Sequence, residues 1–315
     1  MLESVPKPLA VVCHDAGAAN IIYSWIESCL QVSPRLADFI RIYSCGPAEN
    51  LFNNFDISQV QRSSSIDDVM KNAQTLIAGT GWATSLELQA LDRAKKLGIR
   101  AIAVIDHWIN YSDRFHIDGW QISPIEIWVT DKYAKTIAEN TFPGARVEQM
   151  PNIYFSRSVA LISSLSQSTR TTLRILYVLE PIRKSWGQGR EDGEFDALEY
   201  FYLHINKLFN SPVEEVRLRP HPSDPPGKYD RWLVGPASFR LSLDVRLELE
   251  HSIAWADVVV GCQTMAMAVA LEAGKRVISS MPPWAPPCAL PHEGIEKMAL
   301  KFLDKIPPGK LKTRN

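Results

Sequence analysis

The feature that most constrains this chain is the regular alternation of short apolar runs with stretches whose apolar residues have helical spacing. The first run, residues 9–13, lies between Pro8 and a turn of small and polar residues, and residues 18–30 follow it with a helical apolar stripe. Strands are predicted at residues 9–13, 39–43, 75–78, 100–105, 126–129, 173–179, 215–218, 258–260 and 276–279, and helices at 18–30, 65–73, 85–97, 133–140, 195–208, 247–254 and 265–273. Because strands that alternate with helices form parallel sheets covered on both faces, the sequence predicts an α/β fold.

This pattern is interrupted once, near Pro151. Residues 152–171 are rich in serine and threonine and poor in charge, and a chain of 315 residues has room for about two domains. We therefore expect an N-terminal α/β domain at residues 1–151, a linker at 152–171 and a C-terminal α/β domain at 172–315.

The composition argues against several classes of partner and metal site. The formal net charge is −1 and no dense lysine or arginine stripe occurs, so we expect no nucleic-acid partner. The cysteines are odd in number and form no C-x-x-C motif, which argues against a zinc ribbon or a thioredoxin-like site and is typical of a reducing compartment. They are Cys13, Cys29, Cys45, Cys262 and Cys288.

No targeting or membrane-spanning segment is predicted. The N-terminal residues lack the apolar core of a signal peptide, and no apolar run of about 18 residues occurs. Residues 297–314 are basic; the simpler interpretation is a solvated tail, and the alternative is weak attraction to an anionic membrane surface. We expect a cytoplasmic protein, with peripheral association at the inner face of the membrane left open.

Ligands of open parallel sheets bind beyond the carboxyl ends of the strands, and one such loop in the second half is Gly261-Cys262-Gln263-Thr264. It follows three valines and begins a helix, whose first N–H groups and partial positive charge suit a phosphate. Gly261, Gln263 and Thr264 are thus candidate phosphate contacts, with the Thr264 hydroxyl as an added donor. The alternative is a capped helix in which Thr264 bonds only to its own backbone.

A second candidate loop is Arg219-Pro220-His221-Pro222, directly after a predicted strand. Prolines restrict their neighbours, so this turn holds an imidazole in one place. Arg219 and protonated His221 are candidate phosphate contacts, and His221 is also a catalytic candidate because it can stabilise a departing phosphate. An ordinary proline-bounded turn is the alternative.

Four further residues are candidates on the nucleotide side: Glu180, Arg183 and Lys184 in one loop, and Glu272 elsewhere in the chain. Arg183 and Lys184 follow the first strand of the second half and can reach phosphate, although a solvated charged loop explains them as well. Glu272 lies near the end of the helix that follows Thr264. Its carboxylate can accept two ribose hydroxyls, or it can simply occupy an exposed helix face.

Together these motifs carry a resemblance. The combination of R-P-H-P after a strand with V-V-V-G-C-Q-T and A-L-E-A-G-K-R-V-I resembles the C-terminal half of GT-B glycosyltransferases with a His-Pro motif, over residues 172–280. This group includes bacterial sialyltransferases, capsular Kdo transferases and the polyol-phosphate transferases of wall teichoic acid synthesis. The resemblance implies two Rossmann-like domains with a cleft between them. It also implies that His221 and Thr264 bind the phosphate of a cytidine nucleotide and that Glu272 binds its ribose. Cys262 and Gln263 stand where the family often has paired Ser/Thr.

Catalytic candidates in the first half lie after two predicted strands. His14 and Asp15 follow the first strand, and Asp15 is the kind of carboxylate that removes a proton from an acceptor hydroxyl, as an N-domain aspartate does in the resembled sialyltransferases. The alternative for Asp15 is an N-cap of the first helix. Asp106 and His107 follow a later strand, with Arg114 close behind, which makes a candidate catalytic or acceptor site. A simple Asp-Arg loop clamp is the alternative there.

Several motifs are absent from the sequence. No G-x-G-x-x-G or Walker pattern occurs, which argues against a dehydrogenase or an ATPase, and no H-E-x-x-H or D-x-D motif implies a metal. We therefore predict a glycosyltransferase with no cofactor beyond its substrate, a nucleotide-activated and most simply CMP-linked sugar donor. The predicted acceptor is a glycan or glycolipid of bacterial surface polysaccharide synthesis, such as capsule or lipopolysaccharide. A UDP-sugar 2-epimerase and a non-catalytic nucleotide-binding module are the alternatives.

Overall fold

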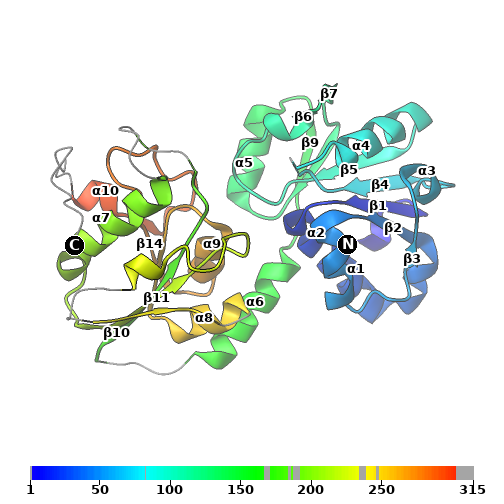
Figure 1. Ribbon diagram of the computed structural model, residues 1–315. Helices are drawn as coiled ribbons and strands as arrows, with labels where there is room; N and C mark the ends of the chain where they lie inside the picture. Colours follow the sequence, from blue (N-terminus) through cyan, green and yellow to red (C-terminus); the bar gives the residue numbers. More distant parts are fainter. Residues whose placement is uncertain are drawn as a thin grey trace. The chain divides into compact units, whose positions relative to one another are not determined.

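The computed structural model describes residues 2–81, 83–166, 171–183, 186, 192–233, 239–245 and 248–302. The chain divides into two compact units, Met1–Ser156 and Arg157–Asn315 (Figure 1). Each unit is built around one parallel sheet, which is the α/β architecture that the sequence predicts. No helix among the described residues is long and apolar enough to cross a membrane.

The N-terminal unit contains a seven-stranded sheet in the order β3-β2-β1-β4-β5-β8-β9, in which all neighbouring strands run parallel. Its strands are β1 (Leu9–Cys13), β2 (Ile40–Ser44), β3 (Gln61–Arg62), β4 (Thr75–Ala78), β5 (Arg100–Val104), β8 (Glu126–Val129) and β9 (Arg146–Gln149), and a separate antiparallel pair is formed by β6 (His116–Ile117) and β7 (Trp120–Gln121). The strand order reverses between β1 and β4. In doubly wound sheets a ligand binds at such a switch point.

Helices cover both faces of this sheet, with α1 on one face and α4 and α5 on the other (Figure 1). The helices are α1 (Ala16–Val32), α2 (Gly46–Leu51), α3 (Ile66–Val69), α4 (Leu86–Leu97) and α5 (Lys132–Thr141). Helix α4 ends at Gly98 in the left-handed conformation (φ 68°), as its sequence predicts. All five residues of β1 are buried, because a parallel sheet covered on both sides has no solvent face.

A large aromatic contact anchors α1 to the core of this unit. Trp25 of α1 and Trp128 of β8 are both buried and meet edge to face, with ring centroids 5.7 Å apart. The indole nitrogen of Trp25 also donates to the carbonyl of Pro151 at 2.8 Å. The helix that directly follows the candidate residues His14 and Asp15 is therefore anchored to the core.

The C-terminal unit contains a six-stranded parallel sheet in the order β12-β11-β10-β13-β14-β15. Its strands are β10 (Leu173–Val178), β11 (Val213–Arg219), β12 (Arg240–Leu243), β13 (Val258–Gly261), β14 (Arg276–Ser279) and β15 (Ile295–Lys297), and its helices are α7 (Gly193–Leu208), α8 (Leu249–Trp255), α9 (Met265–Glu272) and α10 (Met298–Lys301). The switch point of this sheet lies between β10 and β13. Both units thus repeat one doubly wound plan.

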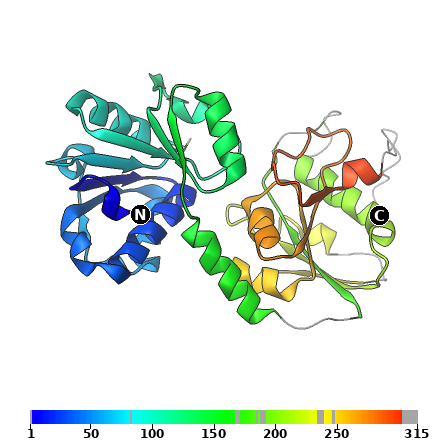
Figure 2. The ribbon, with the colours of Figure 1, turned by 180° about the vertical axis from the view of Figure 1, so that it is seen from behind.

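Helix α6 (Ile153–Leu165) occupies most of the segment that the sequence predicts as a linker. It continues past the boundary between the two units at Ser156 and Arg157. It packs beside α8 (Figure 2), and the Ser158 hydroxyl donates to Glu250 of that helix at 2.6 Å. This part of the predicted linker is therefore ordered secondary structure.

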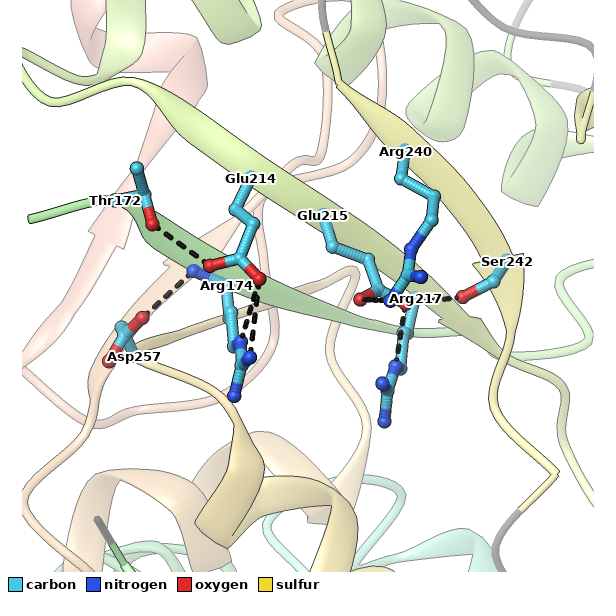
Figure 3. A network of polar contacts seen from close by, with 8 residues as sticks. All are labelled: Thr172, Arg174, Glu214, Glu215, Arg217, Arg240, Ser242 and Asp257. Carbon is cyan, nitrogen blue, oxygen red and sulfur yellow. Dashed lines mark hydrogen bonds and ion pairs between the residues drawn. The ribbon is translucent and has the colours of Figure 1, made fainter. Parts of the chain in front are cut away.

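A polar network ties the first strands of the C-terminal sheet together (Figure 3). Glu215 of β11 is only 1% exposed and accepts hydrogen bonds from Arg217 (2.8 Å), Ser242 (2.7 Å) and Arg240. Burial alone would raise the pKa of Glu215, but these hydrogen bonds outweigh it and lower the pKa to about 2. The ionised carboxylate therefore joins β11 to β12.

Candidate functional site

The candidate site of the N-terminal unit lies at the carboxyl ends of β1, β4 and β5, which are neighbours in the sheet. His14 and Asp15 follow β1, and the Nδ1 atom of His14 donates to Asp15 Oδ1 at 2.8 Å. The imidazole is 14% exposed and the carboxylate 25% exposed. A carboxylate can only accept, so this bond places a proton on Nδ1 and leaves Nε2 of the neutral ring with a lone pair.

Asp15 stands at the N-cap position of α1 but does not cap that helix. Its backbone is extended (φ −84°, ψ 146°), and no side-chain bond to the first turn is formed. The carboxylate instead lies against Gly81 after β4, where a Cβ atom would come within 2.0 Å of Asp15 Oδ2. Asp15 is thus the N-cap residue by position, but its side chain does not cap the helix.

A buried glutamate that the sequence did not single out lies beneath this pair. Glu87, in the first turn of α4, is 2% exposed, and its Oε1 atom accepts the backbone N–H of His14 at 2.7 Å. Its Oε2 atom is buried and has no hydrogen-bond partner among the residues that the structure describes. Burial raises the pKa of Glu87, with the hydrogen bond from His14 acting in the opposite direction. A glutamate in a first helical turn normally indicates only a favourable helix dipole, which explains why its reach to β1 was missed.

Asp106, after β5, is held by a buried arginine. Arg114 is 4% exposed, donates to Asp106 Oδ1 at 2.7 Å, and also donates to the carbonyl of Thr80 after β4. The other oxygen, Asp106 Oδ2, lies over Gly17 in the first turn of α1, where a Cβ atom would come within 1.7 Å of it. The loop clamp that the sequence left open is thus present, and it brings Asp106 to the start of α1.

His107 differs from its neighbour Asp106. Its Nδ1 atom accepts the backbone N–H of Trp108 at 2.9 Å, and its ring packs on the Trp108 indole. The indole N–H of Trp108 in turn donates a hydrogen bond to Asp131 Oδ2 at the start of α5 (2.8 Å). No described contact joins His107 to the His14–Asp15 pair.

The candidate site of the C-terminal unit is centred on the start of α9, beside the switch point between β10 and β13. Thr264 is the N-cap residue, with an extended backbone (φ −80°, ψ 154°) and no side-chain capping bond. The first N–H groups of a helix, here those of Met265 and Ala266, have no carbonyl partner within the helix. The capped-helix alternative is therefore not realised, and the arrangement suits a phosphate.

Gly261 and Gln263 shape this loop rather than present side chains from it. A Cβ atom on Gly261 would lie 2.8 Å from both Cγ2 and the carbonyl oxygen of Val178, so only glycine allows β13 and β10 to approach so closely. The side-chain oxygen of Gln263 accepts the N–H of Ala289 at 3.0 Å. The backbone N–H of Gln263 donates to Glu180 Oε2 at 3.1 Å.

Glu180 thus connects the loops after β10 and β13. Burial raises the pKa of its carboxyl, and nearby Glu194 raises it further, against the hydrogen bond from Gln263. Arg183, three residues later, is exposed. Lys184, the remaining candidate of this loop, lies outside the described residues.

His221 lies after β11 in a tightly bonded turn. Its backbone N–H donates to Asp224 Oδ2 (2.9 Å), and its Nδ1 atom is 2.7 Å from the Ser223 hydroxyl and accepts the Ser223 N–H at 3.2 Å. Burial lowers the pKa of His221; Asp224 opposes this shift and Lys228 adds to it. The bonding favours the neutral ring over the protonated ring that the sequence suggested. Because neighbouring strands are about 5 Å apart, the ends of β11 and β13 are separated by about 10 Å.

The last two candidates on the nucleotide side have different surroundings. Arg219 donates to Asp244 (2.8 Å) and to Ser252 (2.9 Å), so its guanidinium supports the end of β11. Glu272 is exposed at the far end of α9, about 12 Å along the helix axis from Thr264 at 1.5 Å per residue. Among the described residues, no group of three or more His, Cys, Asp or Glu side chains is placed to hold a metal.

These two doubly wound units define a GT-B-like fold. One solved structure with a similar fold is the UDP-GlcNAc 2-epimerase of Neisseria meningitidis bound to UDP-GlcNAc, at 11% identity and a TM-score of 0.52, covering 86% of this chain and 82% of that chain. MurG of Acinetobacter baumannii is similar at 11% identity and a TM-score of 0.51, covering 87% of this chain and 78% of that chain. No protein-family model matches this sequence, and no curated protein matches it.

Proposed function

We propose that this protein is a glycosyltransferase that takes its sugar from a nucleotide-activated donor. The observation that carries the proposal is the uncapped start of α9 at the switch point of the C-terminal sheet. N–H groups that have no partner within the helix, the Thr264 hydroxyl and the positive end of a helix dipole together suit the binding of a phosphate. The fold is compatible with this ligand, because the similar protein of N. meningitidis was solved with UDP-GlcNAc.

The proposed base is His14, oriented by Asp15. The bond from Nδ1 to Asp15 fixes the ring and leaves the lone pair of Nε2 to take a proton from an acceptor hydroxyl. Asp106 is the weaker candidate, because one of its oxygens is committed to Arg114. The N-terminal unit therefore supplies the acceptor side of the proposed reaction.

In the proposed step, the acceptor hydroxyl gives its proton to His14 and its oxygen bonds to the anomeric carbon of the sugar. The bond from that carbon to the phosphate oxygen breaks, and the electron pair leaves with the nucleotide. The start of α9, Thr264 and His221 stabilise the charge on the departing phosphate. By the resemblance to His-Pro-motif transferases, the donor is a CMP-linked sugar and the acceptor is a bacterial surface glycan or glycolipid.

Nucleotide binding gives a first test of the donor. The thermal midpoint of the protein would be measured with CMP, CDP, UDP and GDP, since a ligand at 100 times its Kd stabilises a fold by about 2.7 kcal/mol. The proposal expects CMP or CDP to raise the midpoint most. If none of the four nucleotides raises the thermal midpoint, the proposed donor site is contradicted.

A second candidate function is a nucleotide-sugar 2-epimerase. The observation that favours it is the group of three carboxylates, Asp15, Glu87 and Asp106, that gathers with Arg114 around the ends of β1, β4 and β5. Several acids around one sugar suit proton removal and return at carbon. Incubation with UDP-N-acetylglucosamine and no acceptor separates the candidates: an epimerase yields the epimer or free UDP, whereas a CMP-sugar transferase leaves the compound unchanged.

A further inference from the structure

The turn after β11 contains two residues that the sequence did not single out, and both bond to His221. Asp224 accepts the backbone N–H of His221 at 2.9 Å, the Tyr229 hydroxyl at 3.1 Å and Lys228 Nζ at 2.6 Å. Lys228 also pairs with the buried Glu194 of α7. The backbone of the His-Pro turn is thereby tied to the helix beside it.

Ser223 acts on the ring of His221 rather than on its backbone. Its N–H donates to Nδ1 at 3.2 Å, and its hydroxyl lies 2.7 Å from the same nitrogen. A backbone N–H can only donate, so Nδ1 must carry a lone pair, and the hydroxyl then donates to it as well. The proton of the neutral imidazole is left on Nε2, which has no hydrogen-bond partner among the described residues.

We infer that Ser223 is a positioning residue that fixes His221 as a neutral Nε2–H donor, and that this N–H is what the ring offers to the phosphate of the donor. The charges facing the ring are those of Asp224 and Lys228, with Glu194 behind Lys228. Protonation at Nδ1 would direct a new N–H against the N–H of Ser223. In this arrangement the turn offers the phosphate one N–H of an uncharged imidazole, held in a fixed direction. The positive potential at the phosphate comes from the helix dipole of α9.

The assignment to a phosphate rests on the proposed function, whereas the tautomer does not. The tautomer would be measured by ¹H–¹⁵N spectroscopy of the full chain labelled at its seven histidines, with His221→Gln identifying the resonance. At pH 7 we expect an unprotonated Nδ1 and a protonated Nε2. An imidazolium, or a proton on Nδ1, overturns the inference whether or not any nucleotide binds.

Ser223→Ala tests the positioning role directly. It removes the shorter of the two donors to Nδ1 and leaves only the N–H at 3.2 Å, so the preference for the Nε2–H tautomer should weaken. We then expect a measurable Nδ1–H population, a higher pKa of His221 and a nucleotide Kd raised about three- to tenfold. Ser223→Thr should restore all three, and Ser164→Ala, at an exposed serine of α6, should change none. An unchanged tautomer in Ser223→Ala overturns the inference; a changed tautomer with no nucleotide binding in any variant contradicts only the proposed function.

Discussion

Asp15 Oδ1 lies 2.8 Å from Nδ1 of His14, and this bond decides which imidazole nitrogen remains for a ligand. The pair follows β1 at the switch point of its sheet, and Glu87 holds the backbone of His14 from below at 2.7 Å. Neighbours in sequence thus form an oriented acid–imidazole pair on a rigid support. In the proposed reaction, proton transfer to His14 depends on this relationship.

The first prediction concerns this pair. His14→Ala should lower the rate of sugar transfer by about 10²- to 10⁴-fold, which is the usual contribution of a general base. Asp15→Asn should cause a loss of similar size, because an amide can hold the ring in the wrong tautomer. Nucleotide affinity should be unchanged in both, because the proposed donor site lies in the other unit.

His116→Ala is the matched control for these variants. His116 is exposed, and its Nδ1 atom is hydrogen-bonded to the carbonyl of Ser112 in its own turn (2.9 Å). Transfer by this variant should equal that of the wild type. Full activity in His14→Ala would contradict the assignment of the base.

Glu87 predicts a pH-dependent stability. Its folded-state pKa is raised by burial above that of the unfolded chain, so the protonated carboxyl favours folding and the ionised one opposes it. The free energy of unfolding should therefore fall as the pH rises from about 4.5 through the folded-state pKa. Glu87→Gln keeps an oxygen that can accept the His14 N–H but has no proton to lose. Its free energy of unfolding should therefore fall less as the pH rises.

The measurement for Glu87 is the thermal midpoint at pH 5 and pH 8. The difference between the two should be smaller in Glu87→Gln than in the wild type. Glu139→Gln is the control, since Glu139 lies on α5 with a 53% exposed side chain. Equal pH dependence in all three proteins would contradict this role of Glu87.

Glu215 and Glu296 make a matched pair of ion-paired glutamates. Both have a pKa lowered to about 2: burial opposes the shift at Glu215 but hydrogen bonds from Arg217, Arg240 and Ser242 prevail, and at Glu296 the main cause is the bond from Arg276. The side chain of Glu215 is 2% exposed, whereas that of Glu296 is 30% exposed. The difference in burial should therefore decide how much each glutamate contributes to the free energy of unfolding.

Glu215→Gln should cost about 2–3 kcal/mol of unfolding free energy at pH 7, as expected for a buried charged hydrogen-bond acceptor. Glu296→Gln should cost about 0–1 kcal/mol. The pKa of Glu215 is depressed in the fold, so its contribution is complete above about pH 4.5 and is lost as the pH falls toward 2. Urea unfolding at pH 7 and pH 3 checks both points, and equal losses in the two variants at pH 7 would contradict the argument.

The sequence predicts the centre of each sheet well and the edges poorly. Strands such as β1 and β13 are fully buried apolar runs, which leave a clear pattern. Within the two parallel sheets, the four strands not predicted, β3, β9, β12 and β15, are the outermost strands. The separate antiparallel pair, β6 and β7, was not predicted either. Edge strands are short and partly exposed, so neither an apolar run nor a strict alternation marks them.

The candidate residues show a similar division. Loops at strand ends were identifiable, because the carboxyl-end rule selects them without any knowledge of contacts. The partners of those residues were not: Glu87 reaches His14 across 73 positions, and Asp244 engages Arg219 across 25. Ser223 and Asp224 did carry a local signal, since serine and aspartate beside prolines are typical of turns that side chains stabilise.

The central claim, that the start of α9 binds the phosphate of a nucleotide, is tested most directly by removing one backbone N–H. Met265→Pro deletes the first N–H of the helix at a position that tolerates proline, because Thr264 is already extended. Met265→Ala removes the same side chain and keeps the N–H. Calorimetric titration with CMP should show a Kd about tenfold higher in the proline variant than in the alanine variant, and equal affinities in the two would contradict the account.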